Sequence, residues 1–224
     1  MTRRDLSAGL ELALEASTRG ASLALQAGDT TVETFLREDA PHASDLLGSL
    51  VEALERQGWN KRDLRRVYVG IGPGSFTGLR VAAAVALGLA QALDVDLVAV
   101  PSVAAAAWAG LQVGEIGSVV LDARGGALYL GTYERLEQGI REVLAPTRIR
   151  LAEAKGWPVP AGPLLGEERA PAWLGVEANP NYAWRGPAIP TAAGILNLGR
   201  LQWQQSGASP MEAIRPLYLA AFGA

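Results

Sequence analysis

A glycine-rich turn between an apolar run and a helical pattern constrains the fold of this chain more than any other feature. Residues 67–71 read Val-Tyr-Val-Gly-Ile and carry no charge, which is typical of a short buried strand. The turn Gly-Pro-Gly-Ser-Phe-Thr-Gly follows at residues 72–78, and residues 79–93 then show a small-residue helical pattern. A strand, a glycine turn and a helix in this order predict an α/β layered architecture.

The remaining segments of the N-terminal half fit the same architecture. Two apolar runs around a polar turn with a glycine predict a β-hairpin, and a leucine stripe at helical spacing predicts an amphipathic helix. Ser44 and Ser102 are candidate N-caps, and Gly58 is a candidate C-cap. The predicted strands are residues 10–14, 21–25, 30–37, 67–71 and 95–100, and the predicted helices are residues 44–57, 79–93 and 103–111.

The C-terminal half shows the α/β pattern more weakly. Two strands are predicted around an Arg-Gly-Gly turn, at residues 118–122 and 127–133, and residues 191–204 predict a helix. Residues 138–190 are rich in proline, glycine and tryptophan, so we expect short strands and loops there. The predicted domains are residues 1–103, completed by the C-terminal segment 191–224, and a smaller second domain at residues 104–190. Trp157, Trp173 and Trp184 form either a second interaction surface or ordinary packing.

The glycine turn has two interpretations. The backbone N–H groups of such a turn converge at the N-terminus of the following helix, where they can bind an anion with help from the helix dipole. Alternatively, the glycines only make a tight turn and let the helix pack closely. The lysine and the spacing of a Walker loop are absent. The candidate anion- or nucleotide-binding residues are Gly72, Gly74, Ser75, Thr77, Gly78 and Arg80.

The side chains offer few catalytic groups, because the chain has no cysteine and His42 is its only histidine. Thiolate nucleophiles, disulfides and cysteine metal sites are therefore excluded. Ser44 lies close to His42 in the sequence, but no acid completes a nucleophile–base–orienter set, which argues against protease chemistry. No acidic cluster at metal-ligand spacing stands out. We predict no catalytic residue and no metal site.

The charge balance argues against strong binding to nucleic acid by this chain alone. The chain has 20 basic and 23 acidic residues and a net charge of −3, whereas an independent tRNA-binding protein usually shows a basic face. Any role in RNA chemistry is then expected to pass through a partner. The apolar run at residues 10–14 is too short for a signal peptide or a membrane span, and Gln91 interrupts the run at 81–93. We expect a soluble cytoplasmic protein that does not bind membranes.

Residues 72–80, Gly-Pro-Gly-Ser-Phe-Thr-Gly-Leu-Arg, closely resemble the signature loop of the TsaB (YeaZ) family. Four weaker matches occur along the chain, whereas residues 138–190 match nothing firmly. They are Leu-Ala-Leu-Glu-Ala-Ser-Thr at 12–18, His-Ala-Ser-Asp-Leu-Leu at 42–47, Asp-Ala-Arg at 122–124 followed by Tyr129, and Arg-Pro-Leu-Tyr-Leu at 215–219.

The resemblance implies an actin-like ATPase (ribonuclease H-like) fold, with two related α/β domains that each contain a mixed five-stranded sheet. It implies a non-catalytic subunit that supports a catalytic paralogue, TsaD, in making threonylcarbamoyladenosine on tRNA. A TsaE-like ATPase joins the assembly, and the chain forms a homodimer when alone. tRNA is bound only through the complex. No tightly bound cofactor is expected, although weak ATP or ADP binding at a subunit interface is compatible with the family.

The resemblance also implies a partner-binding surface on the first two helices, residues 44–57 and 79–93. Bulky side chains on one helix and small ones on the other suit a helical bundle between subunits. The predicted partner-facing residues are Leu47, Val51, Leu54, Val85 and Leu89. The alternative is that these side chains belong to the core of the protein itself.

Glu15 departs from the family pattern, which has aspartate at this position. In actin-like ATPases a short acidic side chain in this turn helps to position a hydrated cation, and one more methylene moves the carboxylate by more than ~1 Å. The glutamate therefore argues against independent ATP hydrolysis, the alternative function that the fold suggests. A chaperone-like or purely structural role differs from our hypothesis only in the identity of the partner.

Overall fold

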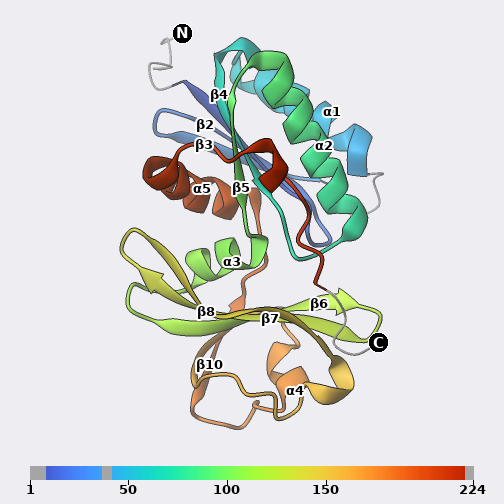
Figure 1. Cartoon of the computed structure of the whole chain (residues 1–224), viewed down its shortest axis with the longest axis vertical. Helices are drawn as coiled ribbons and strands as arrows, with labels where there is room; N and C mark the ends of the chain where they lie inside the picture. Colours follow the sequence, from blue (N-terminus) through green and yellow to red (C-terminus); the bar gives the residue numbers. More distant parts are fainter. Residues whose placement is uncertain (1–8, 37–41, 220–224) are drawn as a thin grey trace. The chain divides into compact units, whose positions relative to one another are not determined.

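The computed structural model describes residues 9–36 and 42–219 of the chain. The chain folds into two compact units (Figure 1). Unit 1 comprises residues 1–102 and 191–217, and unit 2 comprises residues 103–190 and 218–224. Each unit contains one five-stranded sheet, and the two are described separately below.

The sheet of unit 1 has the strand order β3-β2-β1-β4-β5. Its first three strands form an antiparallel meander, and β4 and β5 continue the sheet in parallel with β1. The predicted hairpin, third strand and buried strands are thereby confirmed. The strands are β1 Leu10–Glu15, β2 Ser22–Ala27, β3 Thr30–Phe35, β4 Leu64–Gly70 and β5 Asp96–Val100.

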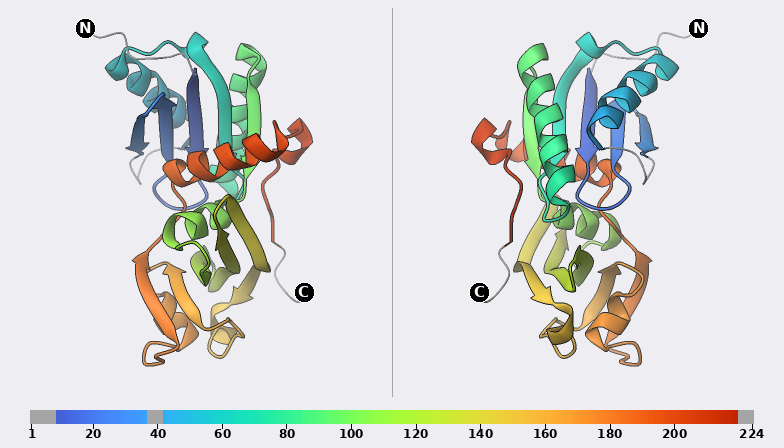
Figure 2. Two further views of the ribbon diagram at one scale, coloured as in Figure 1. Left: turned by 90° about the vertical axis from the view of Figure 1, so that its left-hand side faces the viewer. Right: turned by 90° about the vertical axis from the view of Figure 1, so that its right-hand side faces the viewer.

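Helices cover both faces of this sheet (Figures 1 and 2). Two helices, α1 His42–Gln57 and α2 Phe76–Leu93, lie on one face, and α5 Ala192–Ser206 lies on the other. Short 3₁₀ turns occur at Lys61–Asp63 and Met211–Ala213. Residues 214–219 continue without helix or strand, and the Leu217 N–H donates to the Ile71 carbonyl.

The ends of α1 show which capping predictions hold. Gly58 has a φ of +68°, its N–H donates to the Glu55 carbonyl and the Trp59 N–H donates to the Leu54 carbonyl. These bonds satisfy the last carbonyls of the helix, so the C-cap prediction is confirmed. The N-cap prediction is wrong, because α1 already begins at His42 and Ser44 lies inside its first turn. The side chains at 42–44 lie outside the described residues.

The core of unit 1 follows from the period-2 alternation of its strands. Along β1, Leu10, Leu12 and Leu14 point into the cluster beneath α1 and α2, together with residues of β2 and β4. The alternate residues, Glu11 and Ala13, are buried on the α5 side. Because both faces are covered, β1 is buried along its whole length.

Unit 2 repeats the strand arrangement of unit 1. Its order is β10-β9-β6-β7-β8, with β6, β7 and β8 antiparallel and β6, β9 and β10 parallel. Read from β8, this is the order of unit 1. Two related units with mixed sheets confirm the expected actin-like (ribonuclease H-like) fold class. The elements are α3 Ser102–Gly110, β6 Ile116–Arg124, β7 Ala127–Leu136, β8 Gly139–Arg150, a 3₁₀ turn Leu151–Glu153, β9 Gly162–Gly166, α4 Ala170–Leu174 and β10 Tyr182–Pro187.

The segment 138–190 contains two elements that differ from the short strands and loops that we predicted, the helix α4 and the long strand β8. Strand β8 is 12 residues long, and it lies at the edge of the sheet with half of its residues exposed and one buried. An exposed edge strand needs no alternating apolar pattern, which is why the sequence gives little sign of it. Trp157, Trp173 and Trp184 are half-buried against the core of unit 2, so they are packing residues.

Helix α2 is long and apolar enough to cross a membrane by length and composition alone. It packs against β1, β4 and β5 and beside α1, and its apolar character therefore has a packing role within unit 1.

Candidate functional site

The glycine loop, residues 72–78, runs from β4 into the first turn of α2. Ser75 is the N-cap of α2, since its hydroxyl accepts the Gly78 N–H at 3.3 Å. The helix begins at Phe76, three residues before the predicted start. The predicted loop residues are thus brought together in one turn, with Thr77 and Arg80 exposed on the first turns of the helix.

Close contact with the β1–β2 turn explains two of the loop glycines. The Ser75 N–H donates to the Ser17 carbonyl at 2.7 Å. A Cβ on Gly74 would lie 2.3 Å from the Ser17 carbonyl oxygen, and a Cβ on Gly78 would lie 2.1 Å from that of Ala16. Any larger residue would push the loop and the first turn of α2 away from the sheet.

Ser102, at the start of α3, holds the other end of the loop. Its hydroxyl accepts the Gly72 N–H at 3.0 Å, and its own N–H donates to the Gly72 carbonyl at 2.9 Å. The N–H groups of Gly72, Ser75 and Gly78 therefore all donate to acceptors within the protein. These contacts support the close-packing interpretation of the loop, since an anion would need such N–H groups for itself. Anion binding stays a prediction.

Glu15 ends β1 directly beside this loop and is 1% exposed. Its Oε1 accepts the Ser17 N–H at 2.5 Å, whereas its buried Oε2 has no hydrogen bond of regular geometry. Burial raises the pKa of Glu15, and hydrogen bonds with Ser17 and Ser102 oppose the rise. The carboxyl is thus turned inward among backbone groups.

An apolar surface lies on the outward side of α1 and α2. Leu47 and Val51 on α1 are 46% and 52% exposed, and Phe76 at the start of α2 is 53% exposed. Val85 and Leu89 on α2 are half-buried and also touch the core. Leu54 is only 8% exposed and lies in the core of unit 1, so it is not available to a partner. We therefore remove it from the predicted partner-facing residues.

Phe76 was missed because a single aromatic residue after a glycine turn carries no periodic signal. It begins an exposed stripe on α2 that continues at a spacing of four residues through Arg80, Ala84 and Gly88. The guanidinium carbon of Arg80 lies 3.7 Å from the centroid of the Phe76 ring, a stacking contact that orders both side chains. We call Leu47, Val51, Phe76, Arg80, Ala84 and Gly88 the helical face.

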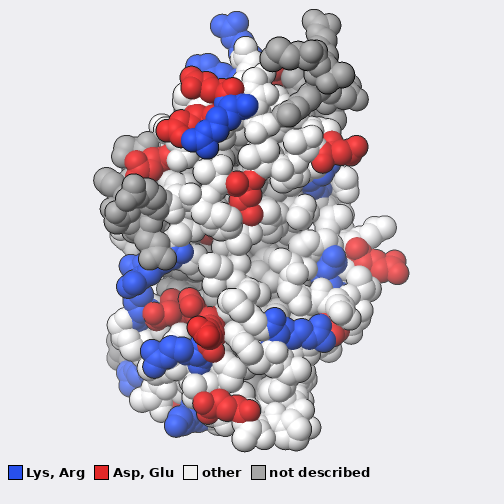
Figure 3. Space-filling view, turned by 180° about the vertical axis from the view of Figure 1, so that it is seen from behind, with Lys and Arg blue, Asp and Glu red and all other residues white. Residues whose placement is uncertain are grey.

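Charged residues on one face of the molecule are mixed in sign. On the side of the molecule drawn in Figure 3, lysine and arginine side chains alternate with acidic ones and are separated by uncharged areas. Among the described residues on this face, the charges do not form the single-sign patch expected of a surface that attracts nucleic acid.

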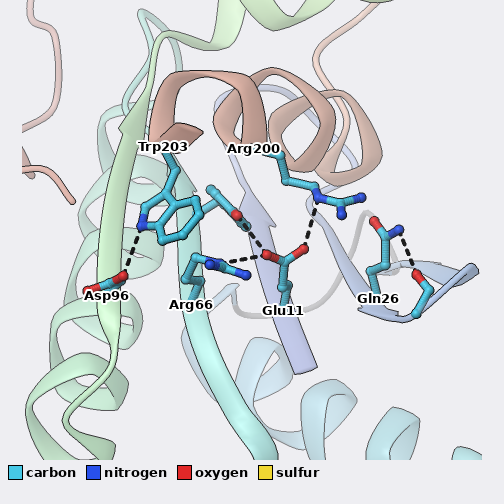
Figure 4. Close-up of polar contacts among 8 residues, drawn as sticks. Glu11, Gln26, Arg66, Asp96, Arg200 and Trp203 are labelled. Carbon is cyan, nitrogen blue, oxygen red and sulfur yellow. Dashed lines mark hydrogen bonds and ion pairs between the residues drawn. The ribbon is translucent and has the colours of Figure 1, made fainter. Parts of the chain in front are cut away.

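A polar network centred on the buried Glu11 lies on the opposite face of the same sheet, beneath α5 (Figure 4). Glu11 accepts from Arg66 Nε at 2.6 Å and from the Tyr68 hydroxyl at 2.9 Å, and Arg200 of α5 lies 3.1 Å from its other oxygen. The Arg66 guanidinium carbon lies 3.9 Å from the centroid of the Trp203 ring, and Trp203 Nε1 donates to Asp96 at 2.8 Å. The network joins α5 to three strands, and no motif in the sequence predicted it.

The Asp-Ala-Arg motif at 122–124 shapes the β6–β7 hairpin of unit 2. Arg124 has a φ of +58°, followed by two glycines that also have positive φ. Its N–H donates to Asp122 Oδ1 at 2.7 Å, which stabilises this left-handed conformation. Tyr129, the last residue of that match, pairs with Leu121 across the hairpin.

Residues 38–183 match the model of the family described as TsaD, tRNA N6-adenosine threonylcarbamoyltransferase. The matched segment is more than half of the chain. It includes α1, the glycine loop and α2.

Three curated proteins called tRNA threonylcarbamoyladenosine biosynthesis protein TsaB are similar to this chain. The one from Bacillus subtilis is 29% identical over 63% of this chain and 62% of its own length. The one from Escherichia coli is 30% identical over 58% and 57%, respectively. The chain thus spans less than two thirds of these two proteins. The one from Haemophilus influenzae is 28% identical over 93% of this chain and 92% of its own length.

Two solved structures of proteins from Pseudomonas aeruginosa share the fold. One is called YeaZ, and it matches with a TM-score of 0.78 and 26% identity over 94% of this chain and 100% of its own. The other is described as similar to peptidase YEAZ, and it matches with a TM-score of 0.79 and 25% identity over 95% of this chain and 100% of its own.

Proposed function

Because the chain belongs to the TsaD family and, within it, to the TsaB (YeaZ) proteins, we propose that it takes part in the biosynthesis of threonylcarbamoyladenosine on tRNA. Its role there is that of a non-catalytic subunit that binds a TsaD-like transferase and supports it. The observation that carries this proposal is the exposed helical face, in a chain that has one histidine and no cysteine.

The helical face has the composition of an interface core. Leu47 and Val51 on α1 and Phe76 on α2 expose large apolar side chains on two helices that pack beside each other, and exposed apolar patches mark sites of protein association. Ala84 and Gly88 carry almost no side chain, so a partner helix can approach the backbone of α2 closely. A helical partner therefore fits this surface best, and two helices from each subunit would form a bundle.

The side chains of this chain support a non-catalytic role. The resemblance gives the catalytic paralogue a metal held by paired histidines, and this chain has one histidine in total. Independent ATP hydrolysis, the alternative, has less support because Glu15 is turned inward and three loop N–H groups are already bonded within the protein.

The further partners follow from the same proposal. In the absence of the transferase, the helical face of one copy would meet that of a second copy in a homodimer. A TsaE-like ATPase would join the assembly, any weakly bound ATP or ADP would lie at a subunit interface, and tRNA would bind through the complex. We expect this assembly in the cytoplasm, where tRNA is modified.

Reconstitution with each component omitted in turn tests the proposal. The chain is co-purified with its cognate TsaD-like subunit, and transfer of the threonylcarbamoyl group to tRNA is measured with and without it. We expect a stable complex, and we expect transfer to collapse when this chain is left out. Full transfer without this chain, or ATP hydrolysis by this chain alone, would contradict the proposed role.

A further inference from the structure

The Glu15 carboxyl lies at the meeting point of three segments of unit 1. Its Oε1 accepts the Ser17 N–H at 2.5 Å and so fixes the β1–β2 turn. Its Oε2 lies on the side of Gly70 in β4, beside the hydroxyl of Ser102 at the start of α3. One side chain thereby contacts the turn after β1, the end of β4 and the residue that begins α3.

The end of β4 is shaped to accept this glutamate. A Cβ on Gly70 would lie 2.1 Å from Glu15 Oε2 and 2.8 Å from Ser102 Oγ, so no residue larger than glycine fits while the carboxyl is in place. The φ of Gly70 is not in the left-handed region, which means that space, not backbone conformation, requires glycine here. Glu15 and Gly70 are therefore complementary in shape.

Two of the three segments that Glu15 contacts, the β1–β2 turn and the start of α3, hold the glycine loop. The Ser17 carbonyl accepts the Ser75 N–H, and Ser75 is the N-cap of α2. Ser102 bonds to both backbone groups of Gly72 at the other end of the loop. A displacement of the carboxyl would therefore be passed to the loop at two points, and from the loop to the first turn of α2, where Phe76 and Arg80 lie.

We propose that Glu15 is a positioning residue of the helical face, because its buried carboxyl fixes the two segments that hold the glycine loop and the start of α2. The link from α2 to a partner subunit rests on the proposed function. The link from Glu15 to the loop does not, and it can be measured on this chain alone. In this role the glutamate acts on neighbouring protein groups, where an aspartate at this position in actin-like ATPases serves a cation.

The electrostatics agree with an internal role. The pKa of Glu15 is raised mainly by burial, and the groups that oppose the rise are Ser17, Ser102 and the backbone of Ala16. None of these groups carries a charge. A carboxyl that acted through its charge would be expected beside a lysine or an arginine.

Three substitutions separate shape from charge. Glu15→Gln keeps the length of the side chain and an oxygen that can accept the Ser17 N–H, so it should keep the loop in place. Glu15→Ala removes the contacts, and Gly70→Ala displaces the carboxyl from the other side, so both should loosen the loop. Adding Gly70→Ala to Glu15→Ala should have a smaller effect than Gly70→Ala has in the original chain, since only the close approach to Ser102 Oγ then remains. The matched control is Glu11→Ala, which removes another buried glutamate from β1 at the opposite end of the strand.

Amide hydrogen exchange measures how firmly the glycine loop is held, and titration with the TsaD-like subunit measures the affinity of the helical face for its partner. In Glu15→Ala and Gly70→Ala, we expect the Gly72 and Ser75 amides to exchange at least tenfold faster relative to the β4 amides, and affinity for the partner to fall about tenfold, the size of effect that loss of one well-placed contact gives. Glu15→Gln should stay within about threefold of the original chain in both measurements, a difference of less than ~1 kcal/mol.

The outcomes separate the two proposals. If Glu15→Ala leaves loop exchange unchanged, or if Glu11→Ala loosens the loop equally, the positioning role is refuted whatever the partner does. If Glu15→Gln loosens the loop as much as Glu15→Ala, the negative charge is essential and our account by shape is wrong. If the loop responds as expected but even the original chain binds no partner, the proposed function fails while the role of Glu15 in the loop stands.

Discussion

Replacing Phe76 by alanine should weaken binding to the TsaD-like subunit about thirtyfold. Phe76 is 53% exposed. An aromatic side chain presents roughly 150–250 Å² of surface, so about 100 Å² of Phe76 is left for a partner to cover. At roughly 25 cal/mol per Å², covering this area contributes about 2 kcal/mol once the methyl group of alanine is allowed for. The value also lies in the range of interface residues that dominate binding.

Calorimetric titration of the partner with the Phe76→Ala variant measures this loss. Phe35→Ala is the matched control, because Phe35 is 59% exposed and lies in β3 on the same side as Glu33, whose carboxylate accepts an N–H of α5. Phe35 thus faces away from α1 and α2. The two phenylalanine side chains are buried to a similar extent, so the two variants should lose a similar amount of thermal stability. Only Phe76→Ala should lose affinity for the TsaD-like subunit. Equal affinities for the two variants would refute the assignment of Phe76 to the interface.

Three further predictions address the helical face, the polar network and the buried carboxyl. Val51→Asp should weaken binding of the TsaD-like subunit, and self-association, by about tenfold or more, since a charge would be buried at the interface. Val143→Asp on the exposed edge strand β8 should leave both unchanged in sedimentation measurements. Arg66→Ala should lower the free energy of unfolding by about 2 kcal/mol, because Glu11 stays buried with fewer partners, whereas loss of Arg56 from its exposed pair with Glu52 should cost less than about 0.5 kcal/mol. Urea titration distinguishes these values, and equal losses would contradict the account. Because the pKa of Glu15 is raised above 4.5, its contribution to stability is present at low pH and is lost as the pH rises through the folded pKa. The Glu15→Gln variant lacks this pH-dependent contribution. Its free energy of unfolding relative to the original chain should therefore increase from about pH 4 to pH 7 in urea titrations. If the difference between the two free energies does not change with pH, the carboxyl titrates normally.

The strands and long helices could be predicted from the sequence because their patterns are local. Residues 10–14 and 21–25 are mainly apolar and are separated by a turn with a glycine, which leaves a hairpin as the simplest arrangement. Strand β8 could not be predicted, since it lies at an edge, has only one buried residue and contains Pro146. Its place in the sheet depends on pairing with β7, and that information is not local.

In the candidate site, too, local features could be predicted and contacts between distant segments could not. The loop between β4 and α2 was located from its glycines, but their contacts with Ala16 and Ser17 depend on the fold of a segment more than fifty residues earlier. A helical stripe likewise identifies the apolar side of α1 without showing which residues at its margin remain exposed. Leu54 and Val51 are three residues apart, and one lies in the core while the other is half exposed. The width of the stripe alone does not separate them.

The repeated architecture explains why the helical face occurs in unit 1 alone among the described residues. In each unit three antiparallel strands are followed by two parallel ones, and a helix follows the last strand, α3 after β5 and α5 after β10. The helices between the strands differ. Unit 1 has 16 residues of α1 and 18 of α2 at these places, whereas unit 2 has a three-residue 3₁₀ turn and the five residues of α4. Half-buried tryptophans cover the core of unit 2 where long helices cover that of unit 1. A bundle of helices between subunits can therefore be built on the first repeat and not on the second, which makes the first repeat the place to disrupt the proposed complex.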